Sequence, residues 1–463
     1  MMIPQHDISH SMIRLIWRNG WKTACLFFFF SIIFFNNINT AHSQAVRDAE
    51  IENLLHDYSR PLLLAAGLDP KNVNIGVINH PAFNAFVAGG QNMFFNTGLI
   101  LQADDPNMVI GVIAHEIGHI TGGHLARTSS AVANVQRPAM IATILGFGSI
   151  LAGAGDVGLA LITGSQQVAQ RAFLSYSRGQ EAAADGSALQ LLQLTRQSPD
   201  GLIAMMDNLA GQEVLNEVNQ DPYARSHPLS RHRVAAYEEG ARHSPYRGKK
   251  DPPELQKRHD LVKAKIYGFL ERPSVTLRHY ANDNELTGRY ARAIALHRQG
   301  STNASLALID TLIAQSPNNP YFYELKGQVA CEAGRAKIGI TPYKKAIALM
   351  PDEALFYVGL AGCQLEIIGT DKAFYQAAVE NLRTALRLAP DTIAAYFLLA
   401  KAFGQLERVA YAEWALAEYY ALLRNQQAII HAKRALRGLP KNSVEHIYAR
   451  DILATASSWP KRR

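Results

Sequence analysis

Two histidines and a glutamate stand at the spacing of a metal-dependent hydrolase. His115, Glu116 and His119 form the HExxH motif His-Glu-Ile-Gly-His. On a helix, residues four positions apart share a face, so the two histidines can bind one metal ion while Glu116 reaches a water bound to it. The motif predicts one zinc ion per chain and a peptidase whose general base is Glu116. The structural alternative is two surface histidines on an amphipathic helix.

A catalytic zinc ion needs a third protein ligand as well as an open position for water. His124 resembles the third histidine of the pattern HExxHxxGxxH, but it comes one residue too early for that pattern. We therefore favour Glu181 as the third ligand and interpret His124 as a helix-end histidine. Ser177 and Gln180 have the spacing of a capping box, which predicts that a helix begins there with Glu181 and Asp185 on one face. Asp185 would then accept a hydrogen bond from a ligand imidazole, unless both carboxylates belong to a solvated acidic helix start.

His227 is a further candidate, and the sequence leaves its role open. It precedes Pro228 and is followed by Arg231 and Arg233. One interpretation is a catalytic donor to the oxyanion of the tetrahedral intermediate, with one of the two arginines assisting. Another is a fourth zinc ligand that holds the enzyme at rest until a substrate moves its loop. The third is a structural loop histidine.

Short apolar runs before the motif predict the elements that position it. Residues 73–79 alternate with period two, and glycines break the apolar runs of residues 83–100, so we expect a small antiparallel sheet. Asp105 followed by Pro106 is typical of a helix start and predicts a helix over residues 107–121 that carries the motif. These signals indicate an α+β, mainly helical protein with a zincin-type catalytic domain.

The second half has the internal period of tetratricopeptide repeats. Pro317, Pro351 and Pro390 each end an apolar helix, at spacings of 34 and 39 residues, and 34 is the period of that repeat. We expect an all-α superhelix whose concave face binds other proteins. In the middle copy, aromatic and small residues occupy the positions where paired helices cross: Tyr323, Gly327, Tyr343 and Ala346.

The predicted domain organisation has four parts. They are a signal peptide over residues 1–43, a zinc metallopeptidase domain over 44–243, a linker and connecting helix over 244–282, and the repeat domain over 283–455. Within the second part, residues 138–164 are apolar and rich in Gly and Ala, which fits a buried helical hairpin or a peripheral contact with a membrane or lipophilic partner.

Composition and leader indicate the class and compartment of the protein. Of 463 residues, 48% are hydrophobic and 18% are charged, which fits a globular chain. The formal net charge of +7 is a mild excess without a long basic run, so no nucleic-acid partner is expected. Residues 1–43 have a cationic start, an apolar core too short to span a bilayer, and Ala-His-Ser before Gln44. We expect cleavage there and export to the periplasm.

The three cysteines exclude a disulfide-built scaffold. Cys331 and Cys363 lie 32 residues apart, nearly one repeat. In an oxidising compartment they form either a disulfide or two buried free thiols, and the sequence leaves both open.

Several motifs together resemble a known family. They are the HExxH motif, the Glu181–Asp185 segment, Asn-Ala-Phe at residues 84–86, Gly-Leu-Ile at 98–100, and Ser-His-Pro at 226–228. These residues resemble the gluzincin peptidases related to the CAAX prenyl proteases. The leader and the repeats narrow the resemblance to the periplasmic BepA-like branch, the beta-barrel assembly-enhancing proteases.

This resemblance implies a site and a function. His115, His119 and Glu181 would bind zinc, Glu116 would be the general base, and the substrates would be misfolded or stalled outer-membrane proteins. The repeat domain would bind clients or the outer-membrane assembly machinery. The alternative is a chaperone or adaptor whose metal site is silent, and a weaker one is an intramembrane-type peptidase built around residues 138–164.

Overall fold

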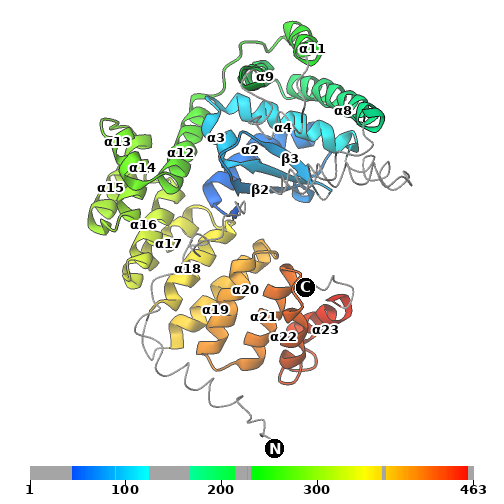
Figure 1. The fold of residues 1–463 in the computed structure, drawn as a ribbon. Coiled ribbons are helices and arrows are strands. Elements are labelled where there is room, and N and C mark those ends of the chain that lie inside the picture. The colour runs from blue at the N-terminus through cyan, green and yellow to red at the C-terminus, as the bar shows by residue number, and fades with distance from the viewer. Residues whose placement is uncertain are drawn as a thin grey trace, which may run out of the picture. The chain divides into compact units, whose positions relative to one another are not determined.

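The computed structural model of the protein describes most of the chain (Figure 1). The described residues are 44–88, 90–124, 167–213, 227, 231–367 and 372–456. The predicted signal peptide and the apolar segment 138–164 lie outside these ranges. Within them, no helix has the length and apolar character needed to cross a membrane.

A four-stranded sheet begins the described chain. Its strands are β1 (Gln44–Val46), β2 (Asn74–Asn79), β3 (Ala85–Ala88) and β4 (Asn92–Asn96), in the order β1-β2-β4-β3. β1 pairs with β2 and β3 pairs with β4 in antiparallel fashion, but β2 and β4 run parallel. The sheet is therefore mixed: the predicted antiparallel pairing is confirmed for two of the three strand pairs and is wrong for β2 and β4. Period-two alternation fixes which side chains share a face, whereas it says nothing about the direction of the neighbouring strand.

Helices cover this sheet and build the N-terminal half. They are α2 (Ala49–Ala65), α3 (Thr97–Gln102), α4 (Pro106–Thr121), α8 (Gln167–Leu194), α9 (Asp200–Glu213) and α11 (Arg231–Arg242), with a short 3-10 helix at Pro70–Asn72. Helix α4 lies at their centre, where it contacts α2, β3, α8 and α9 (Figure 1). Its apolar side chains, including Val109 and Ile113, are fully buried in one core with those of α2 and the strands. The helix that carries the HExxH motif is thus fixed on several sides.

Helix starts test the capping predictions. Asp105 caps α4, because its Oδ1 accepts a hydrogen bond from the Met108 backbone N at 2.9 Å, which confirms the start predicted from Asp105 and Pro106. Helix α8, in contrast, already begins at Gln167. The capping box predicted at Ser177 and Gln180 was wrong, since both residues lie inside the helix.

Two helices follow the N-terminal half, α12 (Pro253–Leu270) and α13 (Pro273–His279). Val262 and Ile266 of α12 are buried in the core of the N-terminal half, while Leu261 is buried in the first core of the repeats. Helix α12 therefore packs into both halves.

Ten helices complete the described chain and pack in sequence order, each against the next (Figure 1). They are α14 (Leu286–Arg298), α15 (Thr302–Gln315), α16 (Pro320–Glu332), α17 (Ala336–Leu349), α18 (Ala354–Leu365), α19 (Lys372–Leu388), α20 (Ile393–Gln405), α21 (Val409–Leu422), α22 (Gln427–Ala435) and α23 (Val444–Ala456). Pro317, Pro351 and Pro390 follow the ends of α15, α17 and α19. The predicted tetratricopeptide-repeat fold is confirmed.

Glycines allow the close crossings in the middle of the repeats. The ring of Tyr343 on α17 lies so near Gly327 and Gly359 that a Cβ on either would stand 2.6 or 2.5 Å from it. Nearby, Cys331 and Cys363 form a disulfide with a Cα–Cα distance of 5.5 Å, so the structure has the disulfide and not the free thiols. The bond links α16 to α18, the first helices of successive repeats.

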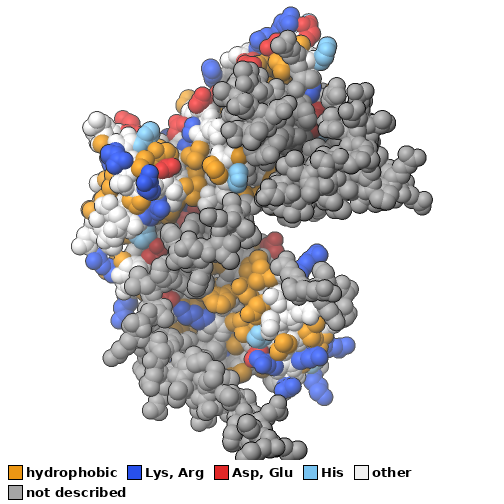
Figure 2. All heavy atoms as spheres, viewed as in Figure 1, with side chains coloured by type: hydrophobic (Ala, Val, Ile, Leu, Met, Phe, Trp, Pro, Cys, Tyr) orange, Lys and Arg blue, Asp and Glu red, His pale blue; other side chains and the backbone are white. Residues whose placement is uncertain are grey.

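The repeat half also exposes hydrophobic side chains. Figure 2 shows such a patch around α20. Ile393 and Phe397 of α20 are each 37% exposed, and the Phe397 ring lies 5.6 Å from that of Tyr419 on α21. Patches of this kind are typical of protein-binding surfaces.

Candidate metal centre

Helices α4 and α8 bring the first three candidate ligands together. His115 and His119 lie one turn apart on α4, and Glu181 lies on α8. The two helices approach closely at Gly118, the glycine of the HExxH motif, where a Cβ would stand 2.8 Å from the Ala184 carbonyl oxygen. A larger residue at that position would push α8, and Glu181 with it, away from the histidines.

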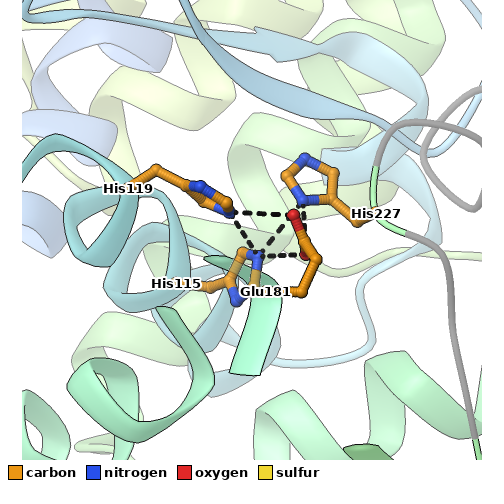
Figure 3. A group of neighbouring side chains, drawn as sticks. All are labelled: His115, His119, Glu181 and His227. Atoms are coloured by element: carbon orange, nitrogen blue, oxygen red, sulfur yellow. Dashed lines mark hydrogen bonds and ion pairs between the residues drawn. The ribbon is translucent and has the colours of Figure 1, made fainter. Parts of the chain in front are cut away.

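A fourth side chain, His227, completes a buried group (Figure 3). One ligand atom from each of His115, His119, Glu181 and His227 lies within 4.8 Å of all the others. His115 Nε2 is 3.1 Å from His119 Nε2 and 3.2 Å from His227 Nδ1. Glu181 lies 3.0 Å from His227 Nδ1 and 3.4 Å from His119 Nε2.

The spacing of these atoms fits one metal ion. Ligand atoms bound at about 2.0–2.2 Å around a tetrahedral ion lie roughly 3.3–3.6 Å apart, close to the distances found here. Three imidazole nitrogens and a carboxylate are also common ligands of transition metals. With such a site, the fold has the features of a metallopeptidase: two histidines on one helix, a carboxylate on the next, and a glutamate beside the first histidine.

Asp185 and Arg233 form a second layer behind the ligands. Asp185 Oδ1 lies 2.9 Å from His115 Nδ1, on the side of the ring that faces away from the group. Arg233 donates through Nε and Nη2 to both oxygens of Asp185, at 2.7 and 2.9 Å, and its Nη1 lies 3.2 Å from Glu181. From the sequence, Arg233 was a possible assistant at the oxyanion, but in the structure it contacts these two carboxylates. No sequence signal predicted that pairing, since Arg233 comes from α11, 48 residues after Asp185.

These neighbours set the charges of the acidic groups. Burial alone would raise the pKa of Glu181, but His227 and His115 hold that pKa below its ordinary value. Burial likewise opposes ionisation of Asp185, yet hydrogen bonds from His115 and Arg233 lower its pKa. Both carboxylates are therefore anionic, as a metal centre requires.

Glu116 behaves differently from the other carboxyl groups. It is 1% exposed, and among the described residues its Oε1 has no hydrogen-bond partner. That oxygen lies 3.5 Å from His227 Nε2. Burial raises the pKa of Glu116, which suits a group that accepts a proton and later returns it.

His124 lies outside the group of four ligand atoms. Its ring is buried, and its Nδ1 is 3.0 Å from Nδ1 of His119. The histidine interpreted as a helix-end residue is thus a neighbour of a candidate ligand. The side chain of Arg231, the other arginine considered at the oxyanion, lies outside the description.

The comparisons with known proteins agree with this architecture. Residues 45–241 match the model of peptidase family M48. Peptidases of that family are metalloproteases.

The relatives are similar over a longer part of the chain. The chain is 26% identical over 337 residues to the beta-barrel assembly-enhancing protease of Yersinia pestis. The matched region covers 70% of this chain and 66% of that protein. Identity to the protein of the same name from Escherichia coli K12 is 26% over 302 residues, covering 63% and 60%. The matches thus span just under two thirds of the relatives' length. They confirm the resemblance described above.

The solved structure of MamA is similar over a smaller part of the chain. MamA from Desulfovibrio magneticus RS-1 matches with a TM-score of 0.32 and 18% identity, covering 36% of this chain and 94% of that chain.

Proposed function

We propose that this protein is a zinc-dependent endopeptidase of the periplasm that degrades misfolded or stalled outer-membrane proteins. The main support is the buried group of His115, His119, Glu181 and His227, with the Glu116 carboxyl beside it. The relatives named beta-barrel assembly-enhancing protease support a role in the assembly of such proteins. In this proposal, the repeat half binds the clients or the assembly machinery.

Zinc is the metal we propose, because imidazole and carboxylate ligands at tetrahedral spacing suit it. When bound, it would polarise the scissile carbonyl and lower the pKa of a water. Glu116 would take the proton from that water and pass it to the leaving amine. Asp185 would hold the His115 ring in the orientation and tautomer that leave Nε2 free for the metal.

We propose that His227 is a resting-state ligand. A catalytic zinc site keeps one ligand position open, whereas His227 would fill the fourth position. Its Nδ1 lies among the ligand atoms, 3.0 Å from Glu181 and 3.2 Å from His115, which supports a ligand more than an oxyanion donor. For the reaction, His227 would have to leave so that water can enter beside Glu116.

The sheet offers a place for an extended substrate. β3 is the last strand in the order, and among the described residues it pairs only with β4. Its neighbour α4 carries the HExxH motif. A peptide that adds to the free edge of β3 would gain main-chain hydrogen bonds with little dependence on sequence, which suits a quality-control protease.

The compartment and the domain organisation belong to the same proposal. The proposed parts are the signal peptide 1–43, the peptidase domain 44–243, the connection 244–282 and the repeat domain 283–455. The disulfide between Cys331 and Cys363 supports an oxidising compartment such as the periplasm. A peripheral membrane contact stays a prediction, because the segment on which it rests lies outside the described residues.

The alternative is a chaperone or adaptor that acts through the repeats. The exposed hydrophobic patch around α20, with Ile393 and Phe397, favours a binding role for this half. Both functions can reside in one chain, so the metal centre must be tested by itself.

Replacing Glu116 tests the proposed chemistry. We expect purified Glu116→Gln protein to retain zinc but to hydrolyse an unfolded outer-membrane protein at least about 10²-fold more slowly, because the proton acceptor is lost. His115→Ala should lose both zinc and hydrolysis. Zinc content by atomic emission and initial cleavage rates are the measurements, with His243→Ala, whose side chain is 78% exposed, as the control.

Two results would contradict the proposal. If the Glu116→Gln protein cleaved at the wild-type rate, Glu116 would not be the proton acceptor. Full rescue of a deletion strain by Glu116→Gln would place the cellular function in binding and favour the chaperone or adaptor.

A further inference from the structure

The turn that ends α4 returns a histidine to the metal centre. We infer that His124 is a positioning residue, which fixes the ring of His119 for metal binding through a hydrogen bond at the opposite ring nitrogen. This inference rests on the proposed metal site and adds a residue to it.

The two ring nitrogens of His119 have separate partners. His119 Nε2 faces the ligand group, 3.1 Å from His115 Nε2 and 3.4 Å from Glu181. His119 Nδ1 faces away from the group and lies 3.0 Å from His124 Nδ1. The two rings are nearly perpendicular, at 78°, with centroids 5.0 Å apart. His124 thus contacts the nitrogen that a bound metal would not use.

The Gly-Gly sequence before His124 makes this contact possible. A Cβ on Gly122 would stand 2.4 Å from His124 Nε2 and 2.8 Å from its Cδ2, so only glycine leaves room for the ring. Gly123 has a φ of +62°, the left-handed conformation that ends a helix and reverses the chain. His124 itself is 5% exposed. The turn therefore holds a buried imidazole against the end of α4.

The chemistry of two imidazoles fixes their tautomers. If His119 binds a metal through Nε2, its proton is on Nδ1 and can be donated only to an acceptor. His124 Nδ1 is that acceptor, so the proton of the neutral His124 ring is on its Nε2. Metal-binding histidines regularly donate their second N–H to such a partner. Asp185 Oδ1 lies 2.9 Å from the second nitrogen of His115, and the geometry assigns the corresponding place at His119 to His124.

Zinc affinity in the Glu116→Gln background tests the inference without depending on activity. His124→Phe keeps an aromatic ring but removes the acceptor, whereas His124→Asn offers an oxygen near the place of Nδ1. We expect His124→Phe to weaken zinc binding about 10–100-fold and His124→Asn to stay within a few-fold of the parent. Chelator competition on the purified full chain measures the affinities, and His243→Phe on the exposed surface should change nothing.

Melting of the metal-free proteins separates positioning from folding. The inference is supported if the Phe and Asn variants melt alike without zinc and differ in zinc affinity. It is overturned if His124→Phe binds zinc as tightly as the parent, or if both variants lose affinity equally. If the parent itself binds no zinc, the proposed metal site fails as well, which distinguishes the two failures.

Discussion

At the scale of single residues, the three candidate histidine ligands differ in their neighbours and in the elements that carry them. His115 has the Asp185 carboxylate at 2.9 Å, and His119 has His124 at 3.0 Å. His227 Nε2 lies 3.5 Å from the Glu116 oxygen Oε1. His115 and His119 also share one helix, whereas His227 lies between α9 and α11. His227 is thus the one histidine of the three that can leave without moving α4.

Removing His227 should therefore open the site. We expect His227→Ala to keep its zinc through His115, His119 and Glu181, and to cleave an unfolded substrate at or above the wild-type rate. Zinc content and initial rates measure this, with the exposed His232→Ala as the control. A loss of about 10²-fold in rate with zinc retained would instead assign His227 to the oxyanion and contradict the resting-state ligand.

At the scale of elements, the site depends on how closely α4 and α8 pack. The Cα of Ala184 would lie 2.9 Å from a Cβ on Gly118, so the contact is between backbones and cannot be relieved by a rotamer change. Glu181 is one turn before Ala184 on α8. The distance between the helices and the geometry of the ligands are thus set by the same glycine.

Gly118→Ala tests this dependence against a matched substitution. We expect it to lower the free energy of unfolding by about 1–3 kcal/mol through overpacking, and to weaken zinc binding because Glu181 moves. Gly186→Ala on α8 is the control, since nothing lies within 4 Å of its Cβ position. That change should leave zinc binding intact and stabilise the helix by about 0.5–1 kcal/mol. Urea unfolding and chelator competition measure both, and unchanged zinc affinity in Gly118→Ala would contradict the argument.

The sequence predicted those parts of the fold and site that depend on local spacing. The helix start at Asp105 follows from one cap, and the shared face of His115 and His119 follows from the helical period. The parallel pairing of β2 and β4 was missed, because strand order depends on packing between segments. The contact of Arg233 with Asp185 was missed for the same reason, because it depends on how α11 packs against α8.

At the scale of the whole molecule, a buried charge cluster joins the two halves. Lys265 of α12 is 3% exposed, and its Nζ lies 2.7 Å from Asp48 and 3.4 Å from Glu50, at the start of α2. The same Nζ lies 3.6 Å from Glu324 on α16 of the repeats. Tyr290 of α14 donates to Glu50 at 2.8 Å. One lysine therefore faces three carboxyl groups drawn from both halves.

This excess of carboxyl groups keeps a proton in the cluster. Burial raises the pKa of Glu324 to about 8. The positive charge of Lys265 lowers this pKa, but the negative charges of Asp48, Glu50 and Glu353 offset part of that lowering. Because the unfolded chain releases this proton near the ordinary carboxyl pKa, the folded state binds more protons between about pH 4.5 and 8. The contribution of Glu324 to stability is therefore present at low pH and is lost as the pH rises through about 8.

Glu324→Gln, which resembles the protonated form, should remove this pH dependence. Between pH 6 and pH 8, we expect the free energy of unfolding to fall more steeply with pH in the wild type than in the variant. The two slopes should differ by at most about 1.4 kcal/mol per pH unit. Urea unfolding at several pH values measures the slopes. Glu366→Gln is the matched control, because Glu366 is an exposed partner of Lys401 in the same repeat half. Equal slopes for wild type and Glu324→Gln would mean that Glu324 is already ionised at pH 6, and that Lys265 holds three carboxylates together without a proton.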